Sequence, residues 1–248
     1  MPGLLIVKPT AFVPSAAGWI GAENFQTKSP REICVAPGTG ARTFEIDLQA
    51  VQNVDSFFLA ATNARADAVW TIQTIAGLGG AVTATHVNAQ PMRLAGNIRT
   101  RYHCLARLPA PVAGRYFRIT VNQPTTPIEI GRVIVGLAFD WPYAYGSGRM
   151  PIDTSRVVSL PDGGFGVDEG VVKTSFQWRF VDLDNAALAK LWQIVEELGE
   201  SKTLLAVEGP DYPPLATSVH YGLFRKLEPY EREDPAATKW ALTVEEWR

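Results

Sequence analysis

Cysteine is scarce in this sequence, with Cys34 and Cys104 as the only two among 248 residues. Two cysteines cannot form the set of disulfide bridges that holds a small secreted domain together, and their spacing matches no zinc motif. Free cysteines in other proteins are usually small buried hydrophobes. We therefore expect both side chains to lie in a core, with no metal and no cofactor bound.

Long hydrophobic runs are also missing. No stretch of 18 consecutive apolar residues occurs, so no membrane-spanning helix and no membrane insertion are expected. The first twelve residues, MPGLLIVKPTAF, have neither the charged start nor the long apolar segment of a signal peptide. These features predict a soluble chain that is made in the cytoplasm.

The familiar motifs of enzymes and nucleotide-binding proteins are absent from the sequence. It contains no HExxH, no GxSxG, no EF-hand loop and no GxxxxGK[ST]. The glycine pairs in residues 38–40 and 146–148 do not extend to a phosphate-binding loop, and we interpret both as turns. We expect no catalytic residues, no cofactor-binding residues and no enzymatic activity.

Two of the three histidines, His103 and His220, lie in sequence contexts that bear on a catalytic role. His103 precedes Cys104, and such a pair can supply a nucleophile and its base. Adjacent residues in a strand point to opposite faces, however, so this pair is not expected to act together. His220 follows a proline-rich turn at the start of a strand, and we expect it at the surface.

Carboxylates are frequent late in the chain, and glycosidases use two of them at a fixed separation. The candidate groups are Glu208 with Asp211, Glu231 with Glu233 and Asp234, and Glu245 with Glu246. Acidic residues in turns and on solvated strand faces give the same pattern without chemistry. We favour this second interpretation.

Arginines and aromatic residues are interleaved in residues 99–118, a pattern that can bind single-stranded nucleic acid by stacking. The residues are Arg99, Arg101, Arg107, Arg115 and Arg118, with Tyr102, Tyr116 and Phe117. No nucleic-acid-binding motif accompanies them. Arginines on the polar faces of strands explain the pattern better.

What the first part of the chain does contain is β-strand patterning. Alternating or continuous apolar residues predict strands at Thr43–Leu48, Ser56–Ala61, Trp70–Ile75, Tyr116–Val121 and Ile128–Phe139, the last buried on both faces. Proline and glycine separate these segments. Several short strands at this spacing favour a β-sandwich or jelly roll. Residues 141–170 are expected to be loop-rich, with one short strand at Arg156–Leu160.

The last third of the chain combines strands with one amphipathic helix. A strand is predicted at Phe176–Val181, followed by a helix that Asp182 or Asp184 caps and Gly199 ends. The predicted buried stripe of the helix is Leu188, Leu191, Trp192, Val195 and Leu198. Further strands are expected at Lys202–Glu208, His220–Leu227 and Lys239–Trp247. We predict that the helix covers a sheet that contains the strands Phe176–Val181 and Trp240–Trp247.

Charge is divided unevenly along the chain. Residues 1–149 contain 13 Lys and Arg against 8 Asp and Glu, whereas residues 151–248 contain 10 against 17. With the glycine- and proline-rich segment between them, this predicts two domains, 1–146 and 147–248. The expected fold class is mainly β: an N-terminal β-sandwich jelly roll and a C-terminal α+β sandwich with one flanking helix.

The first domain resembles the discoidin-like, galactose-binding type of jelly roll found in many bacteriophage structural proteins. The segments that carry the resemblance are Phe44–Leu48, Val54–Leu59, Ala68–Ile72, Arg115–Thr120 and Ile128–Gly136. Some cellular relatives bind sugars or lipids through loops at one end. The sequence shows no cluster of loop aromatics with carboxylates, and no calcium site, that would carry this activity over.

The second domain resembles the tail-tube-like fold of siphophage distal tail and baseplate proteins, which is a β-sandwich with one helix. The order of Phe176–Val181, the helix ending at Leu198, Lys202–Val207, Tyr221–Pro229 and Trp240–Trp247 carries this resemblance. Members of that group form rings around the channel that DNA crosses. In the commoner distal tail plan the ring-forming part comes first, whereas here the jelly roll does.

The two resemblances together imply a non-enzymatic structural component of a bacteriophage tail tip or baseplate. We expect a homo-oligomeric ring at the end of the tail tube, a hexamer or a trimer, bound to other tail tube and baseplate proteins in the virion. Genomic DNA would pass without sequence-specific binding, past a wall whose negative charge repels phosphate. The alternative is a glycan-binding module that contributes to attachment to the host surface; a hydrolase with a carbohydrate-binding domain is a remote third.

Overall fold

The computed structural model describes residues 3–96, 101–209, 216–232 and 237–247. Strands make up 58% of the described residues and helices 8%, which confirms the mainly β prediction. Contacts between residues divide the chain into two units, here called the jelly-roll unit (Gly3–Asp140 with Leu205–His220) and the arm unit (Trp141–Leu204 with Tyr221–Arg248). The domain boundary at residue 146 stays a prediction.

The jelly-roll unit is built around an antiparallel sheet with the strand order β2-β4-β7-β5-β6, in which β9 also pairs with β4. These strands are β2 (Val13–Ser15), β4 (Gly40–Thr62), β5 (Val69–Ile75), β6 (Val82–Pro91), β7 (Tyr102–Gln123) and β9 (Arg132–Gly136). The unit also contains β1 (Gly3–Val7), the 3-10 helix η1 (Ala22–Gln26), β3 (Cys34–Val35), β8 (Glu129–Ile130) and β10 (Ala138–Pro142). β3 pairs with β8, and β1 pairs with β15 (Thr203–Glu208).

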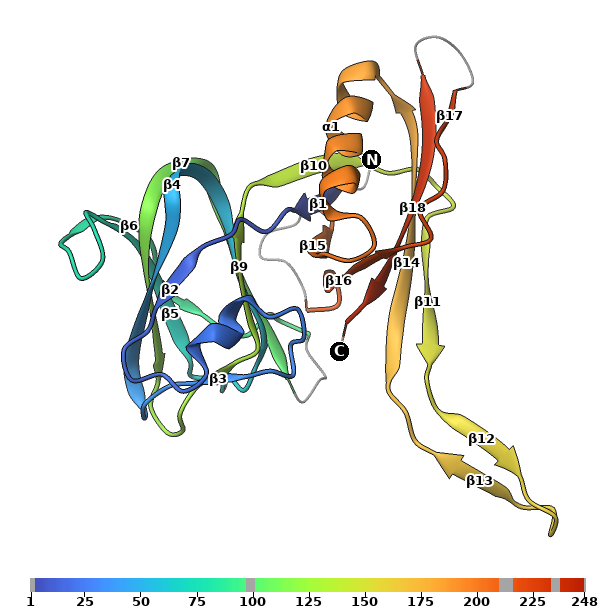
Figure 1. Ribbon diagram of the computed structural model, residues 1–248, viewed down its shortest axis with the longest axis horizontal. Helices are drawn as coiled ribbons and strands as arrows, with labels where there is room; N and C mark the ends of the chain where they lie inside the picture. Colours follow the sequence, from blue (N-terminus) through green and yellow to red (C-terminus); the bar gives the residue numbers. More distant parts are fainter. Residues whose placement is uncertain (1–2, 97–100, 210–215, 233–236, 248) are drawn as a thin grey trace. The chain divides into compact units, whose positions relative to one another are not determined.

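Strands β4 and β7 are long enough to belong to both layers of the sandwich. Their register shifts between Asp47 and Gln52, and the two strands curve over together in Figure 1. Before the shift β4 pairs with the end of β7, which also pairs with β5; after it, β4 pairs with the start of β7 and with β9. At the curve, a Cβ on Gly114 would lie 2.6 Å from the Phe117 ring, so only glycine fits.

The core of this unit follows the predicted alternation. Phe44, Ile46 and Leu48 of β4 are buried in one cluster with Trp70 of β5 and Phe117 of β7. The structure therefore confirms the three predicted strands that contain these residues, because their apolar side chains face the core as the alternation predicted. Each such side chain stabilises the fold by roughly 1.5–3 kcal/mol before the loss of conformational entropy is subtracted.

The predicted strand Ile128–Phe139 is wrong as one element, because the chain there forms three short strands, β8, β9 and β10. The position of the break between β8 and β9 requires glycine, since a Cβ on Gly131 would lie 2.2 Å from the carbonyl oxygen of Pro30. The expected burial on both faces is confirmed, because consecutive residues 133–135 of β9 are all buried.

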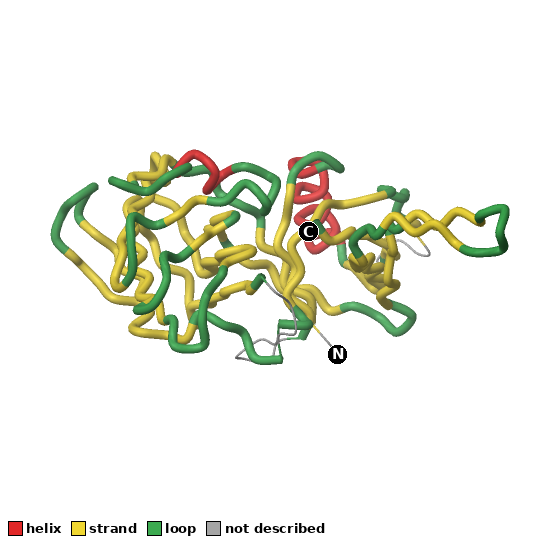
Figure 2. The backbone as a smooth tube through the Cα atoms, turned by 90° about the horizontal axis from the view of Figure 1, so that it is seen from below, coloured by secondary structure: helices red, strands yellow, loops and turns green. Residues whose placement is uncertain are grey.

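The arm unit contains a sheet in which β16, β18, β14 and β11 are neighbours and β17 also pairs with β18. Its elements are β11 (Gly148–Asp153), β12 (Arg156–Ser159), β13 (Phe165–Asp168), β14 (Val172–Leu183), α1 (Asn185–Leu198), β16 (Val219–Arg225), β17 (Glu231–Arg232) and β18 (Thr238–Glu246). The predicted C-terminal strands and helix are therefore present, with small shifts at their ends. Strands β12 and β13 form a separate two-stranded ladder, which Figure 2 shows as a narrow ribbon ending in a loop.

Helix α1 begins and ends as the sequence predicts. The Asp184 side chain accepts a hydrogen bond of 2.7 Å from the backbone N–H of Ala187, which identifies it as the cap, and Gly199 ends the helix with φ +52°. The helix lies on the predicted sheet: Trp192 stacks on Trp240 of β18, and β18 pairs with β14.

The predicted buried stripe of the helix needs one correction. Trp192 is 46% exposed, whereas Ile194, which was not on the predicted stripe, is buried. At 100° per residue, the buried arc is centred near Leu191 and Leu198, which leaves Trp192 at its border. This half-exposed tryptophan becomes part of the candidate site.

Candidate functional site

The two cysteines are free and buried, as predicted. Burial raises the pKa of the Cys34 thiol to about 12, with a further contribution from the nearby charge of Glu23. Burial raises the pKa of Cys104 to about 12 as well, although a contact with Thr62 acts in the opposite direction. Both thiols are therefore protonated near neutral pH and are poor nucleophiles.

His103 and Cys104 lie on opposite sides of β7, as their adjacency predicts. Cys104 belongs to the jelly-roll core, where its Sγ lies 3.6 Å from Oγ1 of Thr62. His103 Nδ1 instead accepts a hydrogen bond of 3.2 Å from the N–H of Ala61, beside the Phe58 ring. The geometry does not form a nucleophile and base pair.

The surface prediction for His220 is wrong. This histidine is only 1% exposed, and its Nε2 lies 3.2 Å from Oε2 of Glu208 on β15. The reason is its position, because the first four residues of β16 are all buried. His220 thus forms an internal polar contact with Glu208. Asp211, the predicted neighbour of Glu208, lies outside the described residues.

The other acidic groups form no carboxylate pair among the residues that the structure describes. Glu245 makes ion pairs with Lys173 and with Arg225, so it is a paired surface residue. Glu246 is buried rather than solvated, and its Oε2 accepts a hydrogen bond of 3.2 Å from the N–H of Thr174. Glu233 and Asp234 are not among the described residues. Over the same ranges, no three His, Cys, Asp or Glu side chains gather as a metal site.

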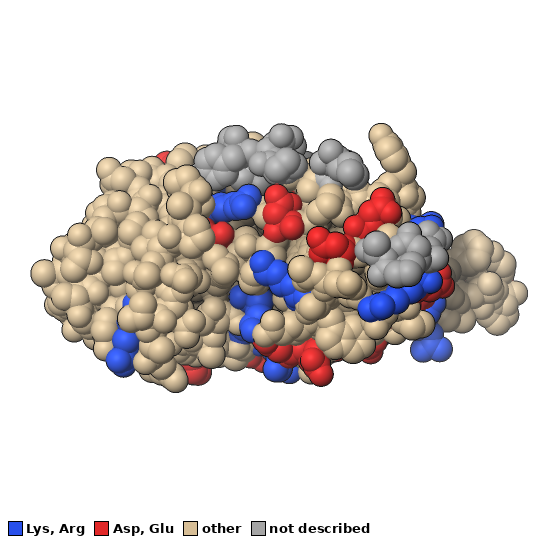
Figure 3. Space-filling view, turned by 90° about the horizontal axis from the view of Figure 1, so that it is seen from above, with Lys and Arg blue, Asp and Glu red and all other residues tan. Residues whose placement is uncertain are grey.

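Three of the five arginines of the predicted cluster are paired with carboxylates. Arg115 donates hydrogen bonds of 2.7 and 2.9 Å to Asp47, Arg118 pairs with Glu45, and Arg101 pairs with Glu129. The hydrogen bond from Arg115 lowers the pKa of Asp47. On the face seen in Figure 3, side chains of both signs are interspersed. These pairs support the interpretation of arginines on polar strand faces; Arg99 lies outside the described residues.

The feature that distinguishes the arm unit is a β-hairpin in the segment expected to be loop-rich. Strand β11 pairs with the first half of β14, and β12 then pairs with β13 beyond them. The junction is held by Thr154, whose hydroxyl bonds the N–H and C=O of Val171, and by Ser155, whose hydroxyl accepts from the N–H of Gly170. A Cβ on Gly170 would lie 2.4 Å from the backbone of Thr154, so the two strands approach too closely for any other residue.

The tip of the hairpin is a tight turn with the residues that such a turn requires. The N–H of Gly163 donates to the C=O of Leu160 at 3.0 Å across Pro161 and Asp162. Proline suits the second position of this turn, and Gly163 adopts φ +85°, which favours glycine. The hairpin is thus specified locally, without support from a core.

The hairpin exposes its apolar side chains. We call residues 156–168 the arm: every residue in it is exposed except Gly164 and Gly166, which are half-buried. Its exposed large hydrophobic residues are Val157, Val158, Leu160, Phe165 and Val167. Because Val157 pairs with Val167 and Ser159 with Phe165, one face presents Val157, Phe165 and Val167 together. Contiguous exposed apolar side chains of this kind make this face a candidate interaction surface.

A second surface of the arm unit is hollowed and aromatic. A groove of about 500 Å³ lies between α1 and the β17 region, and we call it the aromatic groove. It is lined by Asn185, Leu188, Ala189, Trp192, Tyr230 and Arg232. The rings of Trp192 and Tyr230 meet edge to face at 5.7 Å, and both contact Trp240. This arrangement fixes two aromatic side chains beside one guanidinium group.

Sequence reasoning missed both surfaces, although signals for the arm were present. The turn sequence Leu160–Pro161–Asp162–Gly163 between two valine-containing segments is typical of a hairpin. The groove has no comparable signal, because it depends on β17 and α1 meeting in the folded unit.

Comparisons with known proteins give similarities of structure but not of sequence family. No family model matches the chain, and no curated protein matches it. Among solved structures, CpGH89CBM32-6 of Clostridium perfringens is 14% identical over 53% of this chain and 91% of its own, with a TM-score of 0.37. The lectin domain of lectinolysin complexed with Lewis B antigen is 14% identical over 52% and 92%, with a TM-score of 0.37.

A third similar structure is chitosan-binding module 1 of a chitosanase/glucanase from Paenibacillus sp. IK-5. It is 14% identical over 51% of this chain and 94% of its own, with a TM-score of 0.38. Within the ranges described, no helix is long and apolar enough to cross a membrane.

Proposed function

We propose that this chain is a non-catalytic structural protein whose copies associate through the arm. The observation that carries the proposal is the exposed apolar face of Val157, Phe165 and Val167 on a ladder of only two strands. An isolated two-stranded hairpin is marginally stable in water unless it packs against something. Burying these side chains at an interface would contribute roughly 1.5–3 kcal/mol each, before association entropy is subtracted.

The setting we propose is the tail tip or baseplate of a bacteriophage, with the protein as a ring in the virion. Support comes from the order of elements, since β14, α1, β15, β16 and β18 follow one another as the resemblance of the second domain implies. A ring of identical subunits needs surfaces that one subunit leaves uncovered, and the arm is such a surface. In this setting the jelly-roll unit is an accessory domain of the ring.

The experiment is a measurement of particle mass for the full chain by light scattering coupled to size exclusion. We expect the native protein to elute as an oligomer, several times the 27.1 kDa of one chain. The double variant Phe165→Ser with Val167→Ser should elute mostly as monomer at the same concentration. Val51→Ser, which removes an equally exposed valine from the jelly-roll unit, is the matched control and should keep the native mass.

A native protein that is monomeric at every concentration, or an arm variant with native mass, would contradict the proposal. Circular dichroism of each variant shows whether it is folded. The alternative function, glycan binding by the jelly-roll unit, predicts saturable binding on a polysaccharide array. Because the arm belongs to the other unit, that binding would be the same in the native protein and in the arm variant.

A further inference from the structure

We infer that the aromatic groove of one copy is the receptor for the arm of the next copy. The inference rests on the proposed function, because it names the partner surface for the association proposed above. The groove presents Leu188, Trp192 and Tyr230 beside the exposed Ala189. Exposed aromatic residues in a concave site are the anchors that dominate protein interfaces. The most exposed large hydrophobic residue of the arm, Phe165, supplies a matching apolar group.

The charges of the two surfaces are complementary. The arm contains two acidic residues, Asp162 and Asp168, but only one basic residue, Arg156. Arg232 is the one charged side chain that lines the groove among the residues described, and it lies across from the helix. Opposite charges on two surfaces steer their encounter and disfavour the pairing of like surfaces. The arm is thus suited to the groove better than to a second arm.

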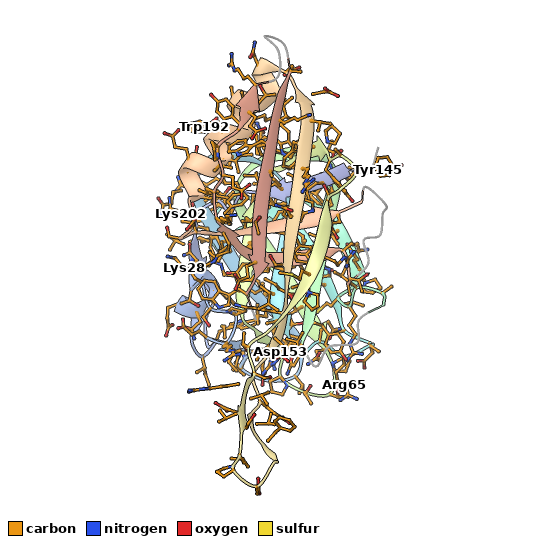
Figure 4. The ribbon with its side chains drawn as sticks, turned by 90° about the vertical axis from the view of Figure 1, so that its right-hand side faces the viewer. Lys28, Arg65, Tyr145, Asp153, Trp192 and Lys202 are labelled. Carbon is orange, nitrogen blue, oxygen red and sulfur yellow. The ribbon has the colours of Figure 1, made fainter. Side chains whose placement is uncertain are left out.

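A copy cannot place its arm in its own groove. The arm precedes β14, and the groove begins at Asn185, directly after β14 ends. The 12 residues of β14, at about 3.3 Å per residue, span about 40 Å. Figure 4 shows Trp192 near one end of these strands and Asp153, just before the arm, near the other. Since β14 is paired with β11 or β18 at every residue from Val172 to Phe180, this part of the strand cannot fold back.

The contact is therefore between different copies and joins two different surfaces. Such a head-to-tail contact generates a closed ring if the rotation between copies closes, and an open filament if it does not. The structure thus points to one interface, repeated at each subunit boundary, with the arm donated by one copy and the groove by its neighbour.

The test blocks the groove without disturbing the helix. Ala189→Glu places a larger, negative side chain at an exposed helical position of the groove, and glutamate is a good helix former. We expect this variant to lose at least 90% of its oligomer by light scattering. Ala186→Glu, at an exposed position of the same helix outside the groove lining, is the matched control and should keep the native mass.

Mixing two defective variants distinguishes the arm-to-groove contact from an arm-to-arm contact. The arm variant (Phe165→Ser with Val167→Ser) keeps its groove, and Ala189→Glu keeps its arm. An equimolar mixture should form dimers of twice the 27.1 kDa chain mass and nothing larger, because only one working contact is available per pair. A mixture that stays monomeric, from variants that are each folded by circular dichroism, would overturn the inference.

The inference and the proposed function fail in different ways. If Ala189→Glu keeps the native mass while the arm variant does not, the protein assembles through the arm but the groove is not its receptor. If the groove instead holds a glycan or another small ligand, Ala189→Glu likewise keeps the native mass while the arm variant does not. If the native chain is monomeric, both the proposed function and this inference are wrong.

Discussion

Val157 and Val167 lie directly opposite each other in the β12–β13 ladder, and they are 60% and 59% exposed. In a soluble monomer such a cross-strand valine pair normally has one face against a core. Here the hairpin is held by backbone hydrogen bonds, by the turn at Gly163 and by the junction at Gly170. These contacts restrict the conformations open to the hairpin, which reduces the entropy lost when a partner covers it.

Gly170→Ala tests whether the junction positions the arm. A Cβ there would lie 2.4 and 2.5 Å from backbone atoms of Thr154 and Ser155, so the strands must separate. We expect at least a tenfold weaker association, measured by sedimentation velocity, with little change in thermal unfolding because the arm has no core. Gly148→Ala is the control, since a Cβ at Gly148 meets nothing within 4 Å. Equal association of the two variants would show that the junction does not matter.

The buried thiols should be unreactive in the folded protein. With a pKa of about 12 for Cys34 and Cys104, only about 10⁻⁴ of each thiol is ionised at pH 8. We expect no reaction with a disulfide reagent in an hour, and reaction of both thiols after denaturation. Because an unfolded thiol ionises near pH 8.5, stability should also fall as the pH rises from about 8.5 toward 12. Rapid native reaction of one thiol would contradict this.

Asp184→Ala removes the side chain that caps α1. The loss of the hydrogen bond to the N–H of Ala187 should lower the free energy of unfolding by about 1 kcal/mol, measured by urea denaturation. Asp184→Ser keeps an oxygen acceptor at the cap and should recover most of this loss. If both variants are equally destabilised, the carboxylate acts through something other than capping.

The Asp47–Arg115 pair should contribute to the acid sensitivity of the jelly-roll unit. The hydrogen bond from Arg115 lowers the pKa of Asp47 in the folded state. The stabilisation is therefore complete above the unfolded pKa of about 3.9, and it is lost as the pH falls through the folded value. In Asp47→Asn, the urea midpoint should change less between pH 5 and pH 2 than in the native protein. Identical pH profiles would contradict the assignment.

The strands that have one face on a core could be predicted from the sequence. Of the arm, only the strand Arg156–Leu160 was predicted; the structure confirms it as β12, but its partner β13 was missed. Phe44, Ile46 and Leu48 alternate with polar residues because one face of β4 is buried. In the arm neither face meets a core, so Val157 and Val158 follow each other without alternation. Only the turn at Pro161–Gly163 remained as a local signal, and the prediction of a single short strand did not use it.

The errors at Trp192 and His220 have a different origin. Helical spacing places Trp192 at the edge of the apolar stripe, and sequence alone does not show that the groove leaves this edge open. His220 was expected at the surface because a turn precedes it. Its burial depends on its place in the buried first part of β16 and on the contact with Glu208, a residue 12 positions earlier in the chain. Tertiary context, rather than local pattern, determined both outcomes.

The arm lies just before the first residue of strand β14. Helix α1, which lines the aromatic groove, follows its last residue. Every residue of this strand from Val172 to Phe180 is paired with β11, with β18 or with both. The distance between the arm and the aromatic groove of one copy is therefore set by the backbone geometry of β14 and not by a flexible linker. Under the proposed contact, the length and twist of a single strand determine the curvature of the assembly, and so the number of copies that close it.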